Sequence, residues 1–125
     1  MIATLQCFVI DCPRPRELAA FYRELLGGEV DREDPRWSTD QAWSTLHTPG
    51  GPVLAFQQAP DLRPPAWPDP SRPQQYHLDL GVQDLDAAEA KVLELGGALL
   101  DAGDPGRGWR VYADPVGHPF CLVRE

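Results

Sequence analysis

The sequence predicts an α+β domain made of two tandem units, each with a strand, a helix and three further strands. Two observations support this fold class. An alternating strand, a short turn and an amphipathic helix ending at Gly-Gly occur twice, at residues 7–28 and 75–97. Residues 43–57 then align without gaps over residues 109–123, and rare residues in register indicate a duplication. The coinciding residues are Trp43/Trp109, Pro49/Pro115 and Gly51/Gly117.

The first unit begins with a strand predicted at residues 4–11, where side chains alternate. One face would carry Phe8 and Ile10, and the other Cys7, Val9 and Asp11. Pro13 and Pro15 end this strand, and Pro15 suits the first turn of a helix. The helix has one apolar stripe and stops at Gly27-Gly28; the stripe consists of Leu18, Phe21, Tyr22, Leu25 and Leu26. Short strands are expected at 29–31, 42–46 and 53–57.

The second unit repeats this order. Its first strand, residues 75–82, would place Leu78, Leu80 and Val82 on one face and His77 and Asp79 on the other. Asp84 is a good N-cap for the following helix. The buried stripe of that helix is predicted to be Leu85, Ala88, Val92 and Leu95. The remaining strands are expected at 99–101, 109–113 and 120–123.

A proline-rich connector, residues 59–74, separates unit one (1–58) from unit two (75–125) within a single domain. Its prolines exclude a helix and a central strand and favour an extended crossing. A solvated linker is one interpretation. Trp67 favours the other, in which the connector packs over the domain or against a partner subunit, because large aromatic side chains usually cover a surface.

Composition narrows the possible partners. The chain has 125 residues, the size of one domain, and a net charge of −8 without a cluster of Lys or Arg, which argues against nucleic acid. It has no apolar run long enough to span a membrane and no secretory leader. Three cysteines without a Cys-x-x-Cys pair argue against a disulfide framework. We therefore expect a soluble cytoplasmic protein that contacts neither nucleic acid nor membranes.

The paired units and their turns, especially residues 77–80 and 114–122, resemble the vicinal oxygen chelate superfamily. This group contains glyoxalase I, extradiol dioxygenases, fosfomycin-resistance transferases and bleomycin-resistance proteins, and the chain is most similar to its small glyoxalase-like members. The resemblance implies two βαβββ units that form a paired, partly open eight-stranded barrel. It also implies a concave site between the units for a metal or a small ligand, and it specifies the fold better than the reaction.

The resemblance also allows a test for metal ligands. Metal-using members take one ligand from the first strand and one from the last strand of each unit, and these positions fall on Cys7, Ala55, His77 and Cys121. Only His77 keeps a usual ligand type, and Ala55 offers no donor atom. We therefore expect no metal and no other cofactor. The alternative is a three-ligand zinc site made by Cys7, His77 and Cys121.

Strand alternation predicts which side chains would contact a ligand. The expected ligand-binding residues are His77, Asp79, Cys7, Val9, Gln57 and Cys121. Asp79 shares a face with His77, so it either positions the imidazole or is simply solvated. His118 is interpreted as a turn residue, and the side to which His47 points is ambiguous. Trp43 and Trp109 are either a stacking pair for a flat ligand or core residues, and we favour core.

Two classes of function follow. The first is a metal-free, glyoxalase-like protein that holds an apolar or aromatic small molecule between its units, as bleomycin-resistance proteins sequester drugs. The second is a lyase, isomerase or dioxygenase-like enzyme that uses His77 as a metal ligand or a general base. No phosphate loop, dinucleotide motif or Gly-x-Ser-x-Gly is present. Exposed sheet edges and the connector further predict a homodimer with two-fold symmetry.

Overall fold

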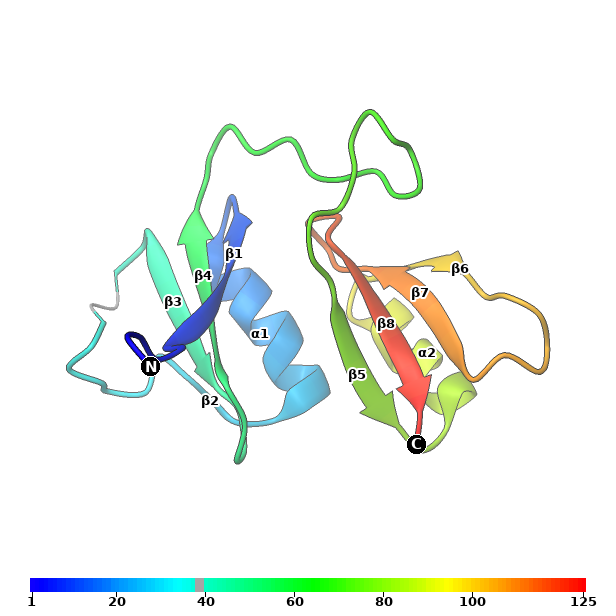
Figure 1. Ribbon diagram of the computed structural model, residues 1–125, viewed down its shortest axis with the longest axis horizontal. Helices are drawn as coiled ribbons and strands as arrows, with labels where there is room; N and C mark the ends of the chain where they lie inside the picture. Colours follow the sequence, from blue (N-terminus) through cyan, green and yellow to red (C-terminus); the bar gives the residue numbers. More distant parts are fainter. Residues whose placement is uncertain (38–39) are drawn as a thin grey trace. The chain divides into compact units, whose positions relative to one another are not determined.

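A computed structural model describes residues 1–37 and 40–125 (Figure 1). The described chain divides into two compact units, Met1–Leu62 and Arg63–Glu125, with the boundary inside the proline-rich connector. Unit one contains β1 (Cys7–Cys12), α1 (Pro15–Leu26), β2 (Glu29–Val30), β3 (Trp43–His47) and β4 (Val53–Gln58). Unit two contains β5 (Leu78–Val82), α2 (Leu85–Glu94), β6 (Ala98–Asp101), β7 (Trp109–Ala113) and β8 (Pro119–Arg124). The predicted order of elements is confirmed in both units.

The same strand order occurs in both sheets. Unit one has the order β1-β4-β3-β2, and unit two has the order β5-β8-β7-β6. The first and last strands of each unit are parallel neighbours, and the other pairs are antiparallel. The α+β fold class with two βαβββ units is therefore confirmed. Each sheet keeps two edges, so the eight strands of the expected partly open barrel form two four-stranded sheets that are not closed into a barrel.

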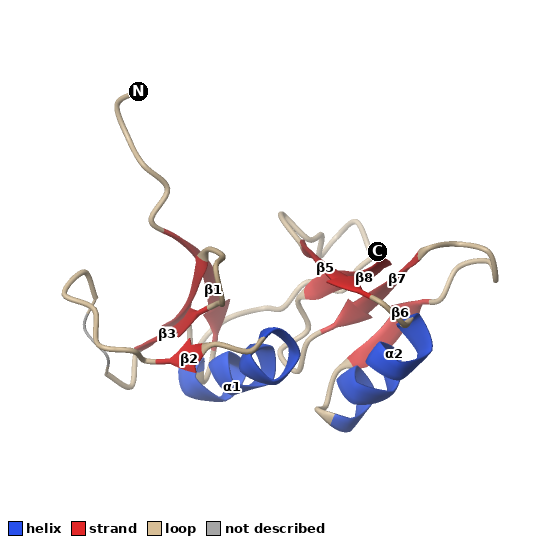
Figure 2. Cartoon of the chain, turned by 90° about the horizontal axis from the view of Figure 1, so that it is seen from below, coloured by secondary structure: helices blue, strands red, loops and turns tan. Residues whose placement is uncertain are grey.

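Each helix covers one face of its own sheet (Figure 2). In unit one, the buried side chains of α1 include Leu18, Phe21 and Tyr22, and the Tyr22 ring stacks on Phe56 of β4 with centroids 5.9 Å apart. Since Phe56 pairs with Ile10 and Leu54 pairs with Phe8, these residues share the face under the helix. The opposite face of each sheet is called the helix-free face below.

In unit two, Leu85 and Val92 are the buried residues of α2. Asp84 caps this helix as predicted, and its Oδ1 accepts hydrogen bonds from the backbone N–H of Asp86 and Ala87 at 2.9 and 3.1 Å. A polar contact joins α2 to the sheet, because the hydroxyl of the fully buried Tyr112 donates to Glu89 at 2.8 Å. Neither α1 nor α2 has the length and apolar character needed to cross a bilayer.

Several strands begin or end a few residues from their predicted bounds. β1 begins at Cys7 rather than residue 4, and β5 begins at Leu78 rather than residue 75. Both strands are shorter at their first end because a strand extends only as far as its hydrogen-bonded partner does. The pairing of β1 with β4 starts at Cys7, and that of β5 with β8 starts at Leu78. The residues before them are therefore outside the sheets.

The connector folds back on itself. The backbone N–H of Ala66 donates to the Arg72 carbonyl at 2.8 Å, and Trp67 is half buried. A Cβ added at Gly117, in the turn before β8, would lie 3.0 Å from Pro64. The second part of the connector thus packs on unit two, which favours the packed interpretation over a fully solvated linker.

Candidate functional site

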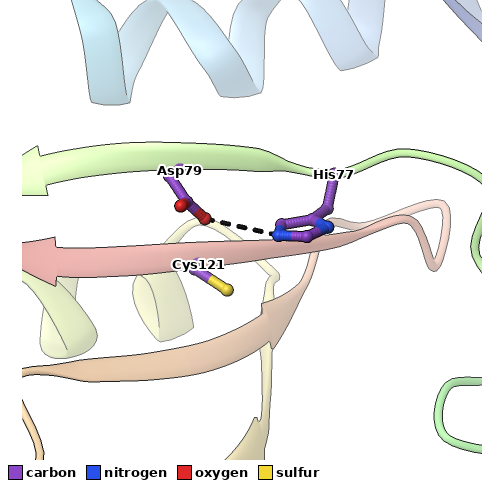
Figure 3. Close-up of side chains that lie close together, drawn as sticks. All are labelled: His77, Asp79 and Cys121. Atoms are coloured by element: carbon purple, nitrogen blue, oxygen red, sulfur yellow. Dashed lines mark ion pairs between the residues drawn. The ribbon is translucent and has the colours of Figure 1, made fainter.

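The helix-free face of the second sheet brings together three of the side chains predicted to contact a ligand. Asp79 of β5 is the direct neighbour of Cys121 of β8, whereas Leu78 pairs with Phe120 and Leu80 with Leu122 on the face under α2. His77 immediately precedes β5. Its Nε2 lies 3.5 Å from Oδ1 of Asp79, and the candidate ligand atoms of His77, Asp79 and Cys121 all lie within 4.8 Å of one another (Figure 3).

Burial differs sharply within this cluster. The side chains of His77 and Asp79 are 43% and 62% exposed, whereas Cys121 is buried. Burial is the main reason that the pKa of the Cys121 thiol rises to about 11, and the neighbouring Asp79 carboxylate adds to the rise by its charge and by a hydrogen bond. At neutral pH the thiol is therefore protonated and can donate to Asp79, whose carboxylate remains open to a ligand.

An arginine that no sequence pattern singled out lies near this cluster. Arg107 stacks on the Trp109 ring, with its guanidinium carbon 3.7 Å from the ring centroid, and it binds the carboxylate of Asp101 at 3.2 Å. Its positive charge opposes the rise in the Cys121 pKa. Only the fold brings it close to β8, because it belongs to the loop between β6 and β7. In the sequence it lies between the strands predicted at 99–101 and 109–113, and no pattern there indicates a role.

The exposure of Trp109 corrects the prediction that this residue belongs to the core. Its side chain is 42% exposed and lies beneath Arg107, so it is not a core residue. Trp43 is half buried. His118 follows the turn at 115–117, and its backbone N–H donates to Asp114 Oδ1 at 3.0 Å, as the turn interpretation requires.

The remaining predicted ligand contacts belong to unit one. Cys7 and Val9 of β1 and Gln57 of β4 lie on the helix-free face of the first sheet, because their neighbours Phe8, Ile10 and Phe56 lie on the face under α1. Cys7 is half buried, and Val9 and Gln57 are exposed. Strand parity is thus as expected, and the contact of these side chains with a ligand stays a prediction.

Within unit two, one group of potential metal-ligating side chains is His77, Asp79 and Cys121. Two of these, His77 and Cys121, belong to the predicted zinc alternative, and Asp79 is an additional donor; the part of Cys7 stays a prediction. The position of Asp79 two residues after His77 was the available signal. Imidazole, carboxylate and thiolate together suit zinc better than the hard cations, which prefer oxygen. Ala55, fully buried, contributes no donor atom.

Comparison with known families identifies the chain. Residues 7–123 match the family described as "Glyoxalase-like domain", which covers both units. None of the curated proteins matches the sequence.

Solved structures with a similar fold come from several bacteria. A glyoxalase/bleomycin resistance protein/dioxygenase family enzyme from Burkholderia phytofirmans is 18% identical, with a TM-score of 0.72 and 98% of each chain covered. A glyoxalase/dioxygenase from Nostoc punctiforme is 21% identical, with a TM-score of 0.71, covering 99% of this chain and 92% of its own. The fosfomycin resistance protein FosX from Listeria monocytogenes is 15% identical, with a TM-score of 0.70, covering 100% of this chain and 95% of its own. At these identities the likeness concerns the fold.

Proposed function

The chain belongs to the glyoxalase-like family of the vicinal oxygen chelate superfamily, and from this premise we propose that it binds a small apolar or aromatic molecule without the usual divalent metal. The observation that carries the proposal is the cluster of His77, Asp79 and Cys121 on the helix-free face of the second sheet. This arrangement suits the anchoring of the polar end of a ligand. A drug-sequestering role, like that of the bleomycin-resistance proteins, is the corresponding biological function.

The chemistry of the cluster limits the chemical class of the proposed ligand. Asp79 offers an exposed carboxylate, which accepts hydrogen bonds, and the protonated Cys121 thiol already donates to it from the buried side. A ligand with an N–H donor, above all an ammonium group, would satisfy the open oxygen. The net charge of −8 also attracts cations over distance. We therefore propose an aromatic ligand with a cationic or donor group.

An isothermal titration with two aromatic probes tests this proposal. Tryptamine and indole-3-propionate share a ring system and differ in the sign of their charge. We expect tryptamine to bind more tightly, and we expect Asp79→Asn to weaken it about tenfold or more, since a hydrogen bond to a charged group contributes roughly 1.5–3 kcal/mol. Asp61→Asn, an exposed acid in the connector, is the matched control. Equal affinity for both probes, no binding of either, or no effect of Asp79→Asn would overturn it.

The second candidate function is that of a metal-dependent enzyme. The specific observation in its favour is the grouping of imidazole, carboxylate and thiol within 4.8 Å. Zinc held there would polarise a substrate oxygen, and the ion itself would favour loss of the thiol proton. A variant of the Listeria FosX has been described in complex with Mn(II) and a dihydroxypropylphosphonic acid. With Mn(II), a set containing a thiol is a poor match, because Mn(II) prefers oxygen ligands.

Native mass spectrometry separates the two candidates. The binding proposal expects no stoichiometric metal after incubation with zinc sulfate or manganese chloride. The enzyme candidate expects one zinc per chain, lost in both His77→Ala and Cys121→Ala. A zinc that persists in either variant would lie elsewhere and would support neither. The same spectra report the number of subunits, and we further propose a homodimer. We also propose a cytoplasmic location, which accords with the three free cysteines.

A further inference from the structure

His77 is the member of the cluster that lies outside the sheet. Asp79 belongs to β5 and Cys121 to β8, and the two residues are direct partners, whereas the pairing of these strands starts only at Leu78. The side chain of His77 is 43% exposed, and Asp79 lies 3.5 Å from its Nε2. The position of the imidazole therefore depends on the residues that precede it.

The corresponding residue of unit one is held by its sheet. In the alignment of the two units, Val53 corresponds to Pro119, and in unit one Cys7 pairs with Val53 at the start of β1. A proline has no N–H to donate to a ladder. The pairing in unit two accordingly starts one residue later, and His77 lacks the strand pairing that Cys7 has.

The connector contains a closed loop shortly before this point, residues 64–73, which we call the connector loop. The backbone N–H of Ala66 donates to the Arg72 carbonyl at 2.8 Å, and that of Asp69 donates to the Ala66 carbonyl at 2.8 Å. Oδ1 of Asp69 accepts from both the backbone N–H and the hydroxyl of Ser71, at 2.9 and 2.8 Å. Asp69 thus closes the loop through its backbone and its side chain.

Proline content makes the connector loop stiff. Because a proline ring fixes φ, ordering such a segment costs less conformational entropy than ordering other residues. A proline-rich segment also acts as a semi-rigid spacer rather than a flexible chain. Half of the loop consists of prolines, namely Pro64, Pro65, Pro68, Pro70 and Pro73.

The connector loop is anchored on the turn before β8. A Cβ added at Gly117 would lie 3.0 Å from Cβ of Pro64 and 3.6 Å from the carbonyl oxygen of Pro65. Gly117 also has a φ of 112°, which favours glycine. The turn itself is held by Asp114, which is 3% exposed and whose Oδ1 accepts the Gly117 N–H at 3.0 Å. The loop therefore packs on a well-fixed part of unit two.

The same turn lies beside His77. Since Leu78 pairs with Phe120, His77 is level with Pro119, two residues after Gly117. Figure 1 shows the start of β5 and the turn before β8 at the same end of the second sheet. The first residues of the connector loop are thus anchored next to the point to which the chain returns at His77.

Three residues, 74–76, join the connector loop to His77. At about 3.3–3.6 Å per residue, they keep His77 within about 14 Å of the end of the loop. Tyr76 is 93% exposed, so packing does not fix the residue directly before His77. The restraint from this side of His77 therefore comes through the anchored loop.

We propose that the connector loop is a strap that positions His77 for the cluster, with Asp69 as the positioning residue that keeps the strap closed. The inference rests on the proposed function, since it concerns the same binding site. A closed strap restricts the backbone before His77 and holds the imidazole beside Asp79. Restriction before binding reduces the ordering that a ligand must otherwise bring about. Opening the strap should therefore weaken binding although Asp79 itself is unchanged.

Nitrogen-15 relaxation NMR tests the strap without any ligand. Asp69→Ala removes the acceptor of both Ser71 hydrogen bonds, and Asp69→Asn keeps a side-chain oxygen at the same place. We expect backbone order parameters at residues 74–77 near the rigid value of about 0.85 in the parent protein and below about 0.6 in Asp69→Ala. Asp69→Asn should restore the parent values. Asp61→Ala, an exposed acid of the connector before the loop, is the matched control and should leave them unchanged.

Two further measurements separate a local opening from a general loss of stability. The order parameters of β7 should stay at the parent values in every variant. Pro64→Gly removes the ring that lies against Gly117 and so opens the strap independently of Asp69. It should lower the order parameters at residues 74–77 as Asp69→Ala does.

Titration with tryptamine adds the functional readout. Asp69→Ala and Pro64→Gly should each weaken its binding about threefold to tenfold, with Asp69→Asn restoring the parent affinity and Asp61→Ala showing no change. Unchanged order parameters at residues 74–77 in both Asp69→Ala and Pro64→Gly would overturn the inference. Lower order parameters with unchanged tryptamine affinity would overturn it as well, because the loop would then not act on the site. A parent protein that binds no tryptamine would refute the proposed function, and the order parameters would still decide whether the loop holds His77.

Discussion

Replacing Asp79 with asparagine should make the Cys121 thiol more acidic and faster to alkylate. Burial, the charge of Asp79 and its hydrogen bond together raise the pKa of Cys121 from 9.0 to about 11. Only the thiolate form of a cysteine reacts. At a pH below both pKa values, each unit by which the pKa is higher lowers the thiolate fraction tenfold, so at pH 8 Cys121 should react about 100-fold more slowly than an ordinary thiol. The substitution removes the charge and leaves burial, so it should recover part of this factor.

The assay follows each cysteine separately. Protein in chelator-containing buffer is treated with iodoacetamide between pH 7 and 9.5, and the rate at Cys121 is read from its peptide by mass spectrometry. In the unmodified sequence the logarithm of the rate should rise linearly with pH across this range. In Asp79→Asn it should be higher at every pH, whereas Asp61→Asn should follow the parent protein. A plateau near pH 9 in the parent protein would refute the raised pKa of Cys121, and identical profiles for the parent and Asp79→Asn would refute the described contact between Asp79 and Cys121.

Four further predictions concern stability and assembly. Tyr112→Phe removes the hydrogen bond to Glu89 and should lower the free energy of unfolding by about 1 kcal/mol in urea titrations, with Tyr76→Phe as an exposed control. Asp84→Ala removes the cap of α2 and should cost about 1 kcal/mol, whereas an equal loss in Asp61→Ala would mean that the cap is not its cause. His47 has a lowered pKa, so the stability that depends on its neutral, buried imidazole is present above pH 6.5, the ordinary pKa, and is lost as the pH falls below that value. The melting temperature of His47→Phe should therefore fall less between pH 7 and 5 than that of the parent protein. Light scattering at tens of micromolar, a range suited to a stable interface, should give the mass of a dimer, and a monomer there would contradict the proposed assembly.

Local features of the structure could be predicted from the sequence because their causes are local. Pro15 begins α1 and Gly27 follows its end, with a φ of 72° that favours glycine. Asp84 begins α2 through its own side chain. The period of two along β5 placed Asp79 opposite the face of Leu78 and Leu80, as the register with β8 confirms.

The duplication is visible in both the sequence and the structure. Pro49 and Pro115 align in the two copies, and each lies near the glycine after its own helix: a Cβ added at Gly27 or Gly96 would meet them at 3.6 and 3.9 Å. Matching turns in the two copies therefore make matching contacts. Because such contacts repeat with the sequence, the strand order of the second unit could be inferred from that of the first.

The sequence by itself determined the order of the elements, their faces and the family, since periodicity, caps and turn residues act over a few positions. Tertiary structure alone decided which distant side chains meet. Asp79 and Cys121 are 42 residues apart and become neighbours through the pairing of β5 with β8, and the charge of Arg107 acts on Cys121 from the loop between β6 and β7. The burial of the His47 ring nitrogens without hydrogen bonds likewise depends on the fold, which brings the Trp37 ring within 6.0 Å of the His47 ring. Contacts between distant residues depend on which strands pair, and a period or a cap that acts over a few positions does not specify the partner strand.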